Sequence, residues 1–367
     1  MRLTIDARFA KHSGIGRHIS SVLAHWPGTP GLAIVANAAD SPPDWQRTVC
    51  QAGMYTLAEQ GPALRQLARA ADITWFPHFA HPWRCPGRWV CTVHDVIHLA
   101  LPELFPGRVR RFAARALLAD VRDRAAAVCF VSRFTRDEFH RLVGAPRGTE
   151  HIVGNGVDPS WSRPAPAPPG WDGRPYVVAV GNVKPHKGLR HLLQAMQDPR
   201  LAELDLVLIG RVDGLRTVDH AAVGLVAGLG ARCRWTGPVG DDELRAWVSH
   251  ARVLAFPSLY EGFGIPPLEA MAAGVPVVAS RIPAVEEVCA ASAWLVPPAD
   301  ADALADGLLH VAQDEELRTR LIHAGRSLAT QWTWSATARS TWQALQTAAG
   351  RPLDHGNSSA ERSDRAT

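Results

Sequence analysis

Short apolar runs alternate with helical patterns along most of the chain. In the first part of the sequence, the apolar runs cover residues 2–6, 32–36, 73–76, 89–93 and 127–131. Helical patterns lie between them, notably at residues 62–70, 107–125 and 134–143. Because strands that alternate with helices form parallel sheets, this order predicts an α/β fold. In such folds, ligands bind at the carboxyl ends of the strands.

A proline-rich stretch at residues 159–171 separates two patterns of this kind. Its five prolines predict a stiff, extended linker. The alternation then starts again, with apolar runs at 176–180, 205–209, 253–256 and 276–279 and helical patterns at 188–197, 241–250, 266–273 and 300–313. The sequence therefore predicts two doubly wound, Rossmann-like domains, at residues 1–165 and 172–330.

The end of the chain has a different character. A helical pattern at about 333–349 is accompanied by Trp332, Trp334 and Trp342, which present a large apolar surface. Residues 350–367 are polar and poor in apolar side chains, so we expect this tail to be disordered.

The apolar run at residues 251–257 leads into a glycine-rich loop that carries Glu261. Pro266 and Pro267 suit the first turn of a helix, because a missing N–H group costs little there, and Glu269 falls inside that helix. Free N–H groups at a helix N-terminus bind anions. Two carboxylates that flank an anion site suit a ligand with hydroxyl groups at both ends and phosphate in the middle. That description fits a nucleotide-sugar.

Composition restricts the class of protein. The 367 residues suffice for about two domains, and no apolar stretch approaches the roughly 20 residues that span a bilayer. The first residues lack the apolar core of a signal peptide, and the six cysteines form no C-x-x-C pair, so we expect a cytosolic protein with reduced thiols. Residues 1–170 carry 20 basic and 13 acidic side chains, and the remainder carry 19 and 22, which suggests different partners for the two domains.

Lys187 stands beside glycine at the start of a predicted helix, in the loop of residues 180–188. An ammonium group there can neutralise a diphosphate, although a solvated basic turn would have the same sequence.

His94 and His98 have the spacing of a zinc pair, but they follow a strand and Asp95 stands where the zinc motif has glutamate. We therefore interpret His94 as a hydrogen-bonding group of a cleft and expect no metal site.

Two other patterns leave alternatives open. Gly14 and Gly16 do not complete G-x-G-x-x-G, because position 19 is isoleucine, so a dinucleotide site is poorly supported. The helical pattern after residue 106 places arginines 108, 111 and 115 on one side, and Val109, Phe112, Ala116 and Leu117 could line the other. Attachment to anionic lipid and an ordinary surface helix both agree with this pattern.

Six sequence elements resemble, in the same order, the motifs of the retaining glycosyltransferases of family 4, which have the GT-B fold. These elements are residues 14–17, 93–95, 131–134, 155–158, 181–188 and the Glu-x7-Glu element 261–269. They span nearly the whole chain apart from the tail. The resemblance implies two Rossmann-like domains that face each other across a cleft, and a last helix that crosses back onto the first domain.

The resemblance also implies roles for individual residues. Glu261 would hold hydroxyl groups of the donor sugar, and Glu269 would hold the ribose of the nucleotide. Lys187 would stabilise the departing diphosphate, and His94 would form a hydrogen bond to the sugar near the reacting carbon.

Glycines would provide the remaining donor contacts. Gly14 and Gly16 would let the loop of the first domain close over the diphosphate. The N–H groups of Gly262, Phe263 and Gly264 would meet the diphosphate or the sugar.

The chain departs from the family at Asn182, where many members carry an arginine that acts with the lysine on the diphosphate. Lys184 or Arg211 would have to supply the missing charge.

The resemblance implies a retaining hexosyltransferase in which the leaving phosphate oxygen acts as base, and we expect neither a metal nor a cofactor to be needed. The loop variants look most like bacterial mannosyltransferases of polysaccharide and O-antigen assembly. GDP-mannose is the first choice of donor, followed by a UDP-sugar or dTDP-rhamnose. The expected acceptor is a lipid-linked oligosaccharide or polysaccharide precursor at the inner face of the cytoplasmic membrane, and no nucleic-acid partner is expected.

Three other classes of protein remain as alternatives. One is an epimerase or phosphorylase of the same architecture, although a phosphorylase would need a cofactor lysine or a phosphate site that the sequence does not locate. Another is a non-catalytic sugar-nucleotide sensor, which the presence of Lys187, Glu261 and His94 disfavours. A two-domain NAD oxidoreductase would need the dinucleotide fingerprint that the chain lacks.

Overall fold

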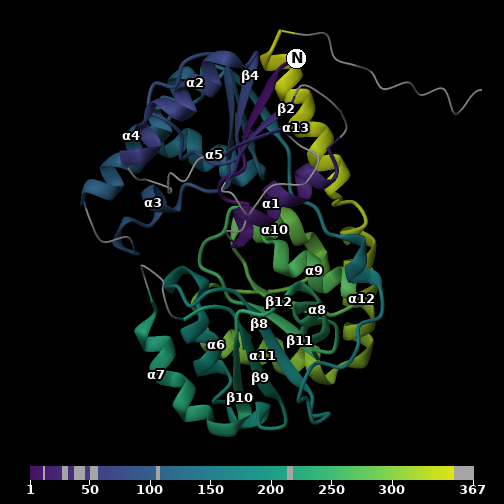
Figure 1. Cartoon of the computed structure of the whole chain (residues 1–367). Helices are drawn as coiled ribbons and strands as arrows, with labels where there is room; N and C mark the ends of the chain where they lie inside the picture. Colours follow the sequence, from purple (N-terminus) through teal and green to yellow (C-terminus); the bar gives the residue numbers. More distant parts are fainter. Residues whose placement is uncertain are drawn as a thin grey trace, which may run out of the picture.

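The computed structural model describes residues 1–10, 13–26, 32–36, 46–49, 57–104, 108–212 and 218–350. Apart from Gly350, the tail that the sequence predicts to be disordered lies outside these residues, as do Cys50 and the first two residues of the loop at 11–18. Figure 1 shows two α/β domains, one above the other. The predicted α/β architecture with two Rossmann-like domains is confirmed.

The first domain is built on a parallel sheet of seven strands. Its strands follow the order β3-β2-β1-β4-β5-β6-β7, and every pair is parallel. The strands are β1 Leu3–Asp6, β2 Leu32–Ala36, β3 Gln46–Val49, β4 Ile73–Phe76, β5 Trp89–Val93, β6 Ala127–Phe130 and β7 Thr149–Ile152. The sheet reverses its winding between β1 and β4, as expected for a doubly wound fold.

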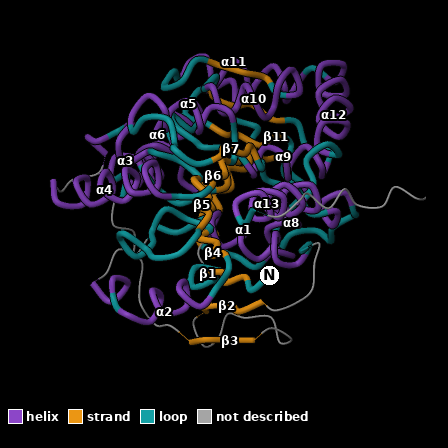
Figure 2. Tube along the Cα trace, turned by 90° about the horizontal axis from the view of Figure 1, so that it is seen from above, coloured by secondary structure: helices purple, strands orange, loops and turns teal. Residues whose placement is uncertain are grey.

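Helices cover both faces of this sheet. They are α1 Ser13–Ala24, α2 Pro62–Ala70, α3 Ile97–Ala100, α4 Arg108–Arg124, α5 Arg133–Leu142 and α13 Trp334–Ala348. Figure 2 shows α1 and α13 on one side of the sheet and α2, α3 and α4 on the other. Burial on both faces explains why the central strands read as continuous apolar runs.

The second domain repeats this plan with six parallel strands in the order β10-β9-β8-β11-β12-β13. The strands are β8 Tyr176–Val180, β9 Asp205–Ile209, β10 Cys233–Gly237, β11 Val253–Phe256, β12 Val277–Ser280 and β13 Trp294–Val296. The helices are α6 Leu189–Ala195, α7 His220–Leu229, α8 Asp241–Ser249, α9 Ile265–Ala273, α10 Pro283–Cys289, α11 Ala301–Gln313 and α12 Glu315–Ala329.

Helix α13 packs on the first domain although it follows the second along the chain. Trp334 and Leu345 are buried in the same core as Trp75 of β4. The ring of Trp342 meets that of Trp26 edge-on, with centroids 5.5 Å apart. Trp332 lies just before the helix and instead packs on Phe263 of the second domain. The tryptophan-rich end of the chain therefore contacts both domains.

The proline-rich segment between the domains is not extended throughout. It begins with a 3₁₀ turn, Pro159–Ser162, and the side chain of Asp158 accepts a hydrogen bond from the N–H of Ser160 at 2.8 Å. Trp161 is buried beneath this turn, in the core that also contains α9. The expectation of a wholly extended linker is therefore wrong for its first residues, because Trp161 finds an apolar site.

Candidate active site

Glu261 lies in the loop between β11 and α9. Its carboxylate accepts hydrogen bonds from Nζ of Lys187 and from Oγ of Ser258, each at 2.6 Å. The loop turns into the helix at Gly264, whose φ of 117° lies in the region that favours glycine. All three groups belong to the second domain, so the carboxylate of Glu261 has both of these partners within its own domain.

The residues after Glu261 present backbone N–H groups ahead of α9. Within the part of the chain that the structure describes, the N–H groups of Gly262, Phe263 and Gly264 donate to no other residue. Free N–H groups at the start of a helix attract anions. The side chain of Phe263 is buried against Trp332, with ring centroids 5.0 Å apart. Phe263 therefore contributes its backbone, and not its side chain, to the surface of this loop.

Lys187 ends a 3₁₀ turn, Pro185–Lys187, and the helix α6 begins only at Leu189. The sequence predicts that the lysine opens the helix, whereas in the structure it precedes the helix. Gly188 has a φ of 64°, and a Cβ at this position would overlap the carbonyl oxygen of Pro257. This close approach holds the lysine turn against the end of β11, from which the Glu261 loop departs.

Lys184 lies near the same group of charges. Burial lowers the pKa of its ammonium group and the charge of Lys187 lowers it further, whereas Asp95 and Glu261 act in the opposite direction. Asp95 belongs to the first domain, so the cluster combines charges from both domains. Two lysines held near two carboxylates provide positive charge that a bound anion can share.

Asn182 and Arg211 are arranged differently. The side-chain oxygen of Asn182 accepts the backbone N–H of Arg211 at 3.1 Å, so it fixes the adjoining loop. Arg211 is exposed. Of the two residues that could replace the missing arginine charge, Lys184 lies close enough to Lys187 and Glu261 for their charges to shift its pKa.

His94 follows β5 of the first domain and is part-buried. Its Nε2 lies 2.8 Å from the carbonyl oxygen of Pro77, and because a carbonyl only accepts, Nε2 carries the proton. Burial lowers the pKa of the ring. The histidine is therefore neutral at pH 7, and its Nδ1 is left as an acceptor. The ring of His18 packs edge-on against it, at 4.8 Å between centroids.

Gly262 brings the two domains together at this point. A Cβ on Gly262 would overlap the carbonyl oxygen of His94. The loop that carries Glu261 therefore touches the loop that carries His94 and Asp95. A residue other than glycine would keep the two loops apart.

Glu269 is buried in α9 and forms an ion pair with Arg17 of the first domain. Arg17 also pairs with Asp241 at 2.8 Å. These residues line a cleft of about 510 Å³ between the domains, together with Gly16 and Arg245. Burial raises the pKa of Glu269 and the charge of Arg17 opposes this shift. The sequence alone assigns Arg17 no role, because nothing along the chain links it to a carboxylate 252 positions away.

Glu261 and Glu269 therefore have different partners. Glu261 contacts Lys187 within the second domain, whereas Glu269 contacts Arg17 across the domain boundary. The Glu-x7-Glu spacing places one carboxylate on the loop and the other in the helix, and the two face separate parts of the site.

Gly14 and Gly16 lie in the first turns of α1, which starts at Ser13, rather than in a loop. Gly16 packs so closely on the backbone of Ala10 that a Cβ would clash with it. A Cβ on Gly14 would meet no atom within 4 Å, so packing does not require glycine there. Gly16 lines the cleft, and the contact of Gly14 with a donor stays a prediction.

Two further histidines of the first domain, His78 and His81, have partners within that domain. His81 contacts Asp120 at 3.1 Å and the carbonyl oxygen of Phe79 at 2.8 Å, and Nδ1 of His78 accepts the N–H of Ala80. Among the described residues, no group of three His, Cys, Asp or Glu side chains has the arrangement of a metal site.

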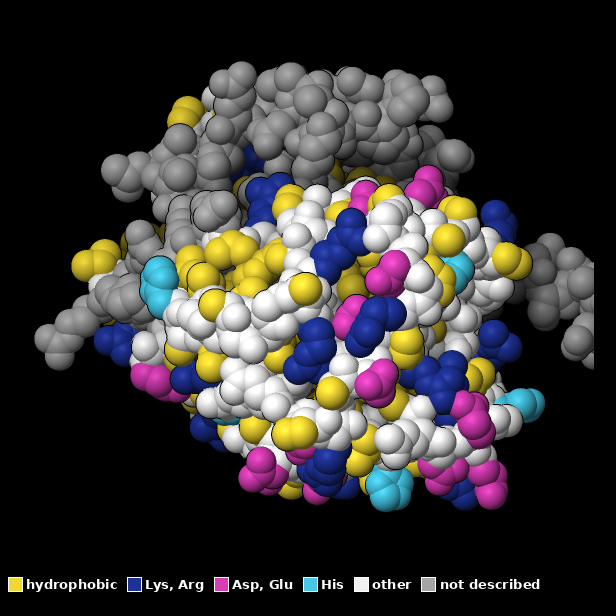
Figure 3. Space-filling model, turned by 90° about the horizontal axis from the view of Figure 1, so that it is seen from below, with side chains coloured by type: hydrophobic (Ala, Val, Ile, Leu, Met, Phe, Trp, Pro, Cys, Tyr) yellow, Lys and Arg dark blue, Asp and Glu magenta, His cyan; other side chains and the backbone are white. Residues whose placement is uncertain are grey.

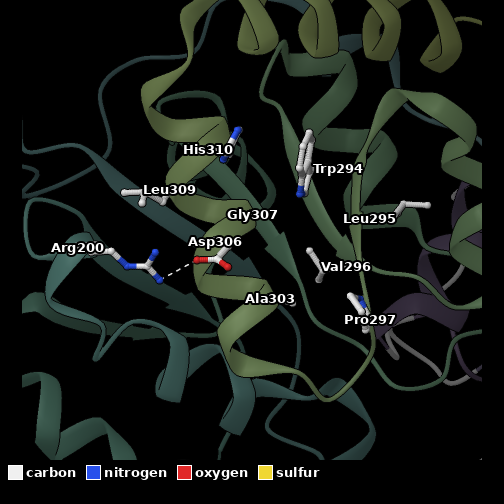
Figure 4. Close-up of a pocket in the computed structure, with 10 residues that line it drawn as sticks. All are labelled: Arg200, Trp294, Leu295, Val296, Pro297, Ala303, Asp306, Gly307, Leu309 and His310. Atoms are coloured by element: carbon white, nitrogen blue, oxygen red, sulfur yellow. Dashed lines mark ion pairs between the residues drawn. The ribbon is translucent and has the colours of Figure 1, made fainter.

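A second hollow, of about 620 Å³, lies between β13 and α11 on the second domain (Figure 4). One side of it carries the ion pair of Arg200 and Asp306, and the ring of His310 stacks on that of Trp294. The charges of Arg200 and Asp306 therefore satisfy each other. None of the residues that form the cluster around Glu261 lines this hollow, so we place the candidate active site in the interdomain region.

Comparison with known proteins agrees with this geometry. Residues 165–328 match the family model described as glycosyl transferases group 1, and residues 21–161 match the model described as glycosyltransferase family 4. The chain is 32% identical over 285 residues to O-antigen chain mannosyltransferase B of Escherichia coli, a match that covers 74% of this chain and 73% of the relative.

Two other matches are informative. The chain is 31% identical over 244 residues to a GDP-mannose-dependent phosphatidylinositol monomannoside mannosyltransferase of Mycobacterium tuberculosis, covering 61% of this chain and 63% of that protein. The structure of Anabaena HepE in complex with UDP-glucose is similar in fold, with a TM-score of 0.76 at 17% identity over 94% of this chain and 99% of that one. The chain therefore belongs to the family 4 glycosyltransferases, which are hexosyltransferases of GT-B fold.

Proposed function

We propose that this enzyme transfers mannose from GDP-mannose, with retention of the anomeric configuration, to a hydroxyl group of a lipid-linked oligosaccharide or polysaccharide precursor. The observation that carries the proposal is the contact of Lys187 with Glu261 beside the His94 loop. It places a cation suited to a diphosphate next to a carboxylate suited to sugar hydroxyls. The mannosyltransferase names of both relatives support mannose, and one of them is named as dependent on GDP-mannose.

Donor binding would change the partners of two carboxylates, those of Glu261 and Glu269. The diphosphate takes Lys187, with Lys184 nearby, and frees the carboxylate of Glu261 for hydroxyl groups of the sugar. The free N–H groups of Gly262 and Phe263 lie where they can add to the binding of the diphosphate. The ribose takes the carboxylate of Glu269 from Arg17.

His94 would contact the sugar as a neutral ring. Since its Nε2–H donates to Pro77, the remaining Nδ1 accepts a hydrogen bond from a sugar hydroxyl. This contact comes from the first domain and the contact of Glu261 from the second. The sugar would therefore be fully held only when the domains are closed, which also excludes water.

The reaction breaks the bond between the anomeric carbon and the diphosphate oxygen, and the electron pair leaves with the diphosphate. Lys187 and the N-terminus of α9 stabilise the charge that develops. The acceptor oxygen attacks from the same face of the sugar and passes its proton to the departing phosphate oxygen. In this mechanism no side chain acts as base, and no metal or cofactor takes part.

The test is to incubate the purified enzyme with GDP-mannose, UDP-glucose and dTDP-rhamnose, with and without a lipid-linked acceptor, and to measure nucleotide release. We expect GDP release that depends on the acceptor, and NMR of the product should show the α configuration of the donor. Release of UDP or dTDP alone would overturn the choice of donor. Conversion of the donor without transfer would indicate an epimerase, and binding without conversion would indicate a sensor.

We also propose that α4 lies on the anionic inner face of the cytoplasmic membrane, where a lipid-linked acceptor would be presented. Val109 and Phe112 are 81% and 75% exposed on this helix, an unusual state for large apolar side chains. Arg111 and Arg115 share the helix, which suits anionic lipid. Leu117, which the sequence grouped with them, is buried in the core.

The lower face of the molecule fits this role less well. On the face shown in Figure 3, basic and acidic side chains are interspersed. None of the helices in the described part of the chain has the length and apolar character that crossing a membrane requires. The proposed contact with lipid is therefore peripheral.

A further inference from the structure

The N-terminus of α5 in the first domain is capped by a carboxylate of the second. The backbone N–H groups of Arg133 and Phe134 each donate to Glu287 at 2.8 Å, one to each carboxylate oxygen. Glu287 lies on α10, and its side chain is only 12% exposed. Helices have unpaired N–H groups at this end and carry positive partial charge there, so an anionic cap is favourable. Here the cap is supplied across the domain boundary.

Two hydroxyl groups of the same helix end reach the active-site loop. Oγ of Ser132 donates to the carbonyl oxygen of Gly262 at 2.6 Å, and Oγ1 of Thr135 lies 3.0 Å from the same oxygen. Ser132 in turn accepts the N–H of Thr135, as an N-cap residue does. Gly262 directly follows Glu261. The first domain therefore fixes the peptide group next to the carboxylate that contacts Lys187.

These contacts form one cluster that exists only when the domains meet. Separating the domains would remove both bonds to Glu287 and both contacts with Gly262. Water would then have to satisfy the N–H groups of α5 and the carbonyl of Gly262. Charge-assisted hydrogen bonds with low exposure are the stronger kind, so breaking them on opening costs free energy, and their presence favours the closed state appreciably.

We propose that Glu287 is a positioning residue: its cap on α5 holds the domains closed and thereby sets the orientation of the Glu261 loop through Ser132, Thr135 and Gly262. Only the expected effect on catalysis rests on the proposed function; the expected effect on domain closure does not. Glu287 touches neither Glu261 nor Lys187, and it acts through helix α5.

The neighbouring residue offers a matched control. Glu286 is on the same helix, and its side chain is 46% exposed. It contacts Arg281 of its own domain at 3.4 Å, and no hydrogen bond or ion pair links its side chain to the described residues of the first domain. Substituting either glutamate removes the same charge from the same helix, but only Glu287 bridges the domains.

The experiment compares Glu287→Ala, Glu287→Gln and Glu286→Gln in the full-length enzyme. Hydrogen exchange at the amides of residues 133–134 and the radius of gyration from small-angle scattering report on the cap and on closure. We expect faster exchange and a larger radius in Glu287→Ala. Glu287→Gln, which retains one acceptor oxygen, should lie between this variant and the wild type. Glu286→Gln should match the wild type.

Activity provides the second readout. Loss of one to two charge-assisted hydrogen bonds corresponds to a decrease in kcat/KM of about tenfold or more in Glu287→Ala. If exchange, radius and kcat/KM all equal those of the wild type, the inference is overturned while the proposed function stands. If no donor is consumed by any variant, the proposed function fails, and the exchange and scattering data still decide whether Glu287 closes the domains. A thermal melting curve identifies any variant that has not folded.

Discussion

Nζ of Lys187 lies 2.6 Å from Oε1 of Glu261. In this arrangement, each of the two groups that we assign to the donor satisfies the other. A donor that offers a diphosphate to the lysine and hydroxyl groups to the carboxylate replaces both halves of the contact at once. A fragment that offers only one of them leaves the other charge without its partner.

The first prediction concerns this pair. Glu261→Ala should decrease kcat/KM by about 100-fold or more, because a contact with the reacting sugar is lost, while the melting temperature changes little. The measurement is GDP release from GDP-mannose in the presence of acceptor. Glu286→Gln, which removes a carboxylate outside the site, is the control. Near wild-type transfer by Glu261→Ala would show that the site is assigned to the wrong residue.

The second prediction concerns Arg17 and pH. Burial raises the pKa of Glu269 above its value in the unfolded chain, so the folded state holds the proton more tightly. The free energy of unfolding therefore falls as pH rises from the unfolded-state pKa through the folded-state pKa. Arg17→Ala removes the charge that opposes this shift. We therefore expect the substitution to destabilise the enzyme more at pH 8 than at pH 5.

Urea unfolding of the wild type and of Arg17→Ala at both pH values measures this difference. Breaking a buried ion pair costs about 3–5 kcal/mol, and the partial exposure of Arg17 places the expected loss at pH 8 below that range. Because the histidines are the same in both proteins, their titration cancels in the comparison. An equal loss of stability at both pH values would contradict the prediction. Arg17→Lys, which retains a positive charge, should recover part of the stability that Arg17→Ala loses at pH 8.

The third prediction concerns the contact between the domains at Gly262. Gly262→Ala places a methyl group where the carbonyl oxygen of His94 lies, so the domains cannot close as they do in the structure. We expect the radius of gyration to increase and transfer to fall by about 100-fold, since a small displacement of reacting groups has large effects. Gly224→Ala in α7, where a Cβ would meet nothing within 4 Å, is the control. Unchanged transfer by Gly262→Ala would exclude the observed closure as the active arrangement.

The fourth prediction tests the surface of α4. The double substitution Val109→Asp and Phe112→Asp should abolish binding to vesicles that contain anionic lipid, because it removes apolar area and adds repulsion. Co-sedimentation with anionic and with zwitterionic vesicles measures this, and Val223→Asp, on the exposed face of α7, is the control. Transfer to a water-soluble acceptor should be unaffected. If the variant binds anionic vesicles as the wild type does, α4 is an ordinary surface helix.

The sequence predicts the interior of both sheets and misses their edges. All nine apolar runs correspond to strands in the interior, whereas β3, β7, β10 and β13, which end the two sheets, were not predicted. An interior strand is covered on both faces and paired on both sides, so it is apolar throughout. An edge strand such as β7, with the sequence Thr-Glu-His-Ile, is partly exposed and carries charge, which hides it from a search for apolar runs.

The candidate site divides in a similar way. Residues that act within one domain, such as Lys187 and Glu261, are indicated by local motifs at strand ends. Contacts across the domain boundary, such as Arg17 with Glu269 and Ser132 with Gly262, depend on how the domains meet. No periodicity along the chain encodes that relation. The pairing of Asn182 with the backbone of Arg211 likewise emerges only from the folded loop.

The position of helix α13 along the chain affects the order in which the two domains can finish folding during translation. Trp334, Ala338 and Leu345 belong to the core around β1, yet they follow the whole second domain along the chain. The second domain can assemble while the first still lacks one wall of its core. The domain that is translated first is therefore finished last, and its apolar surface needs protection until residue 348 has emerged.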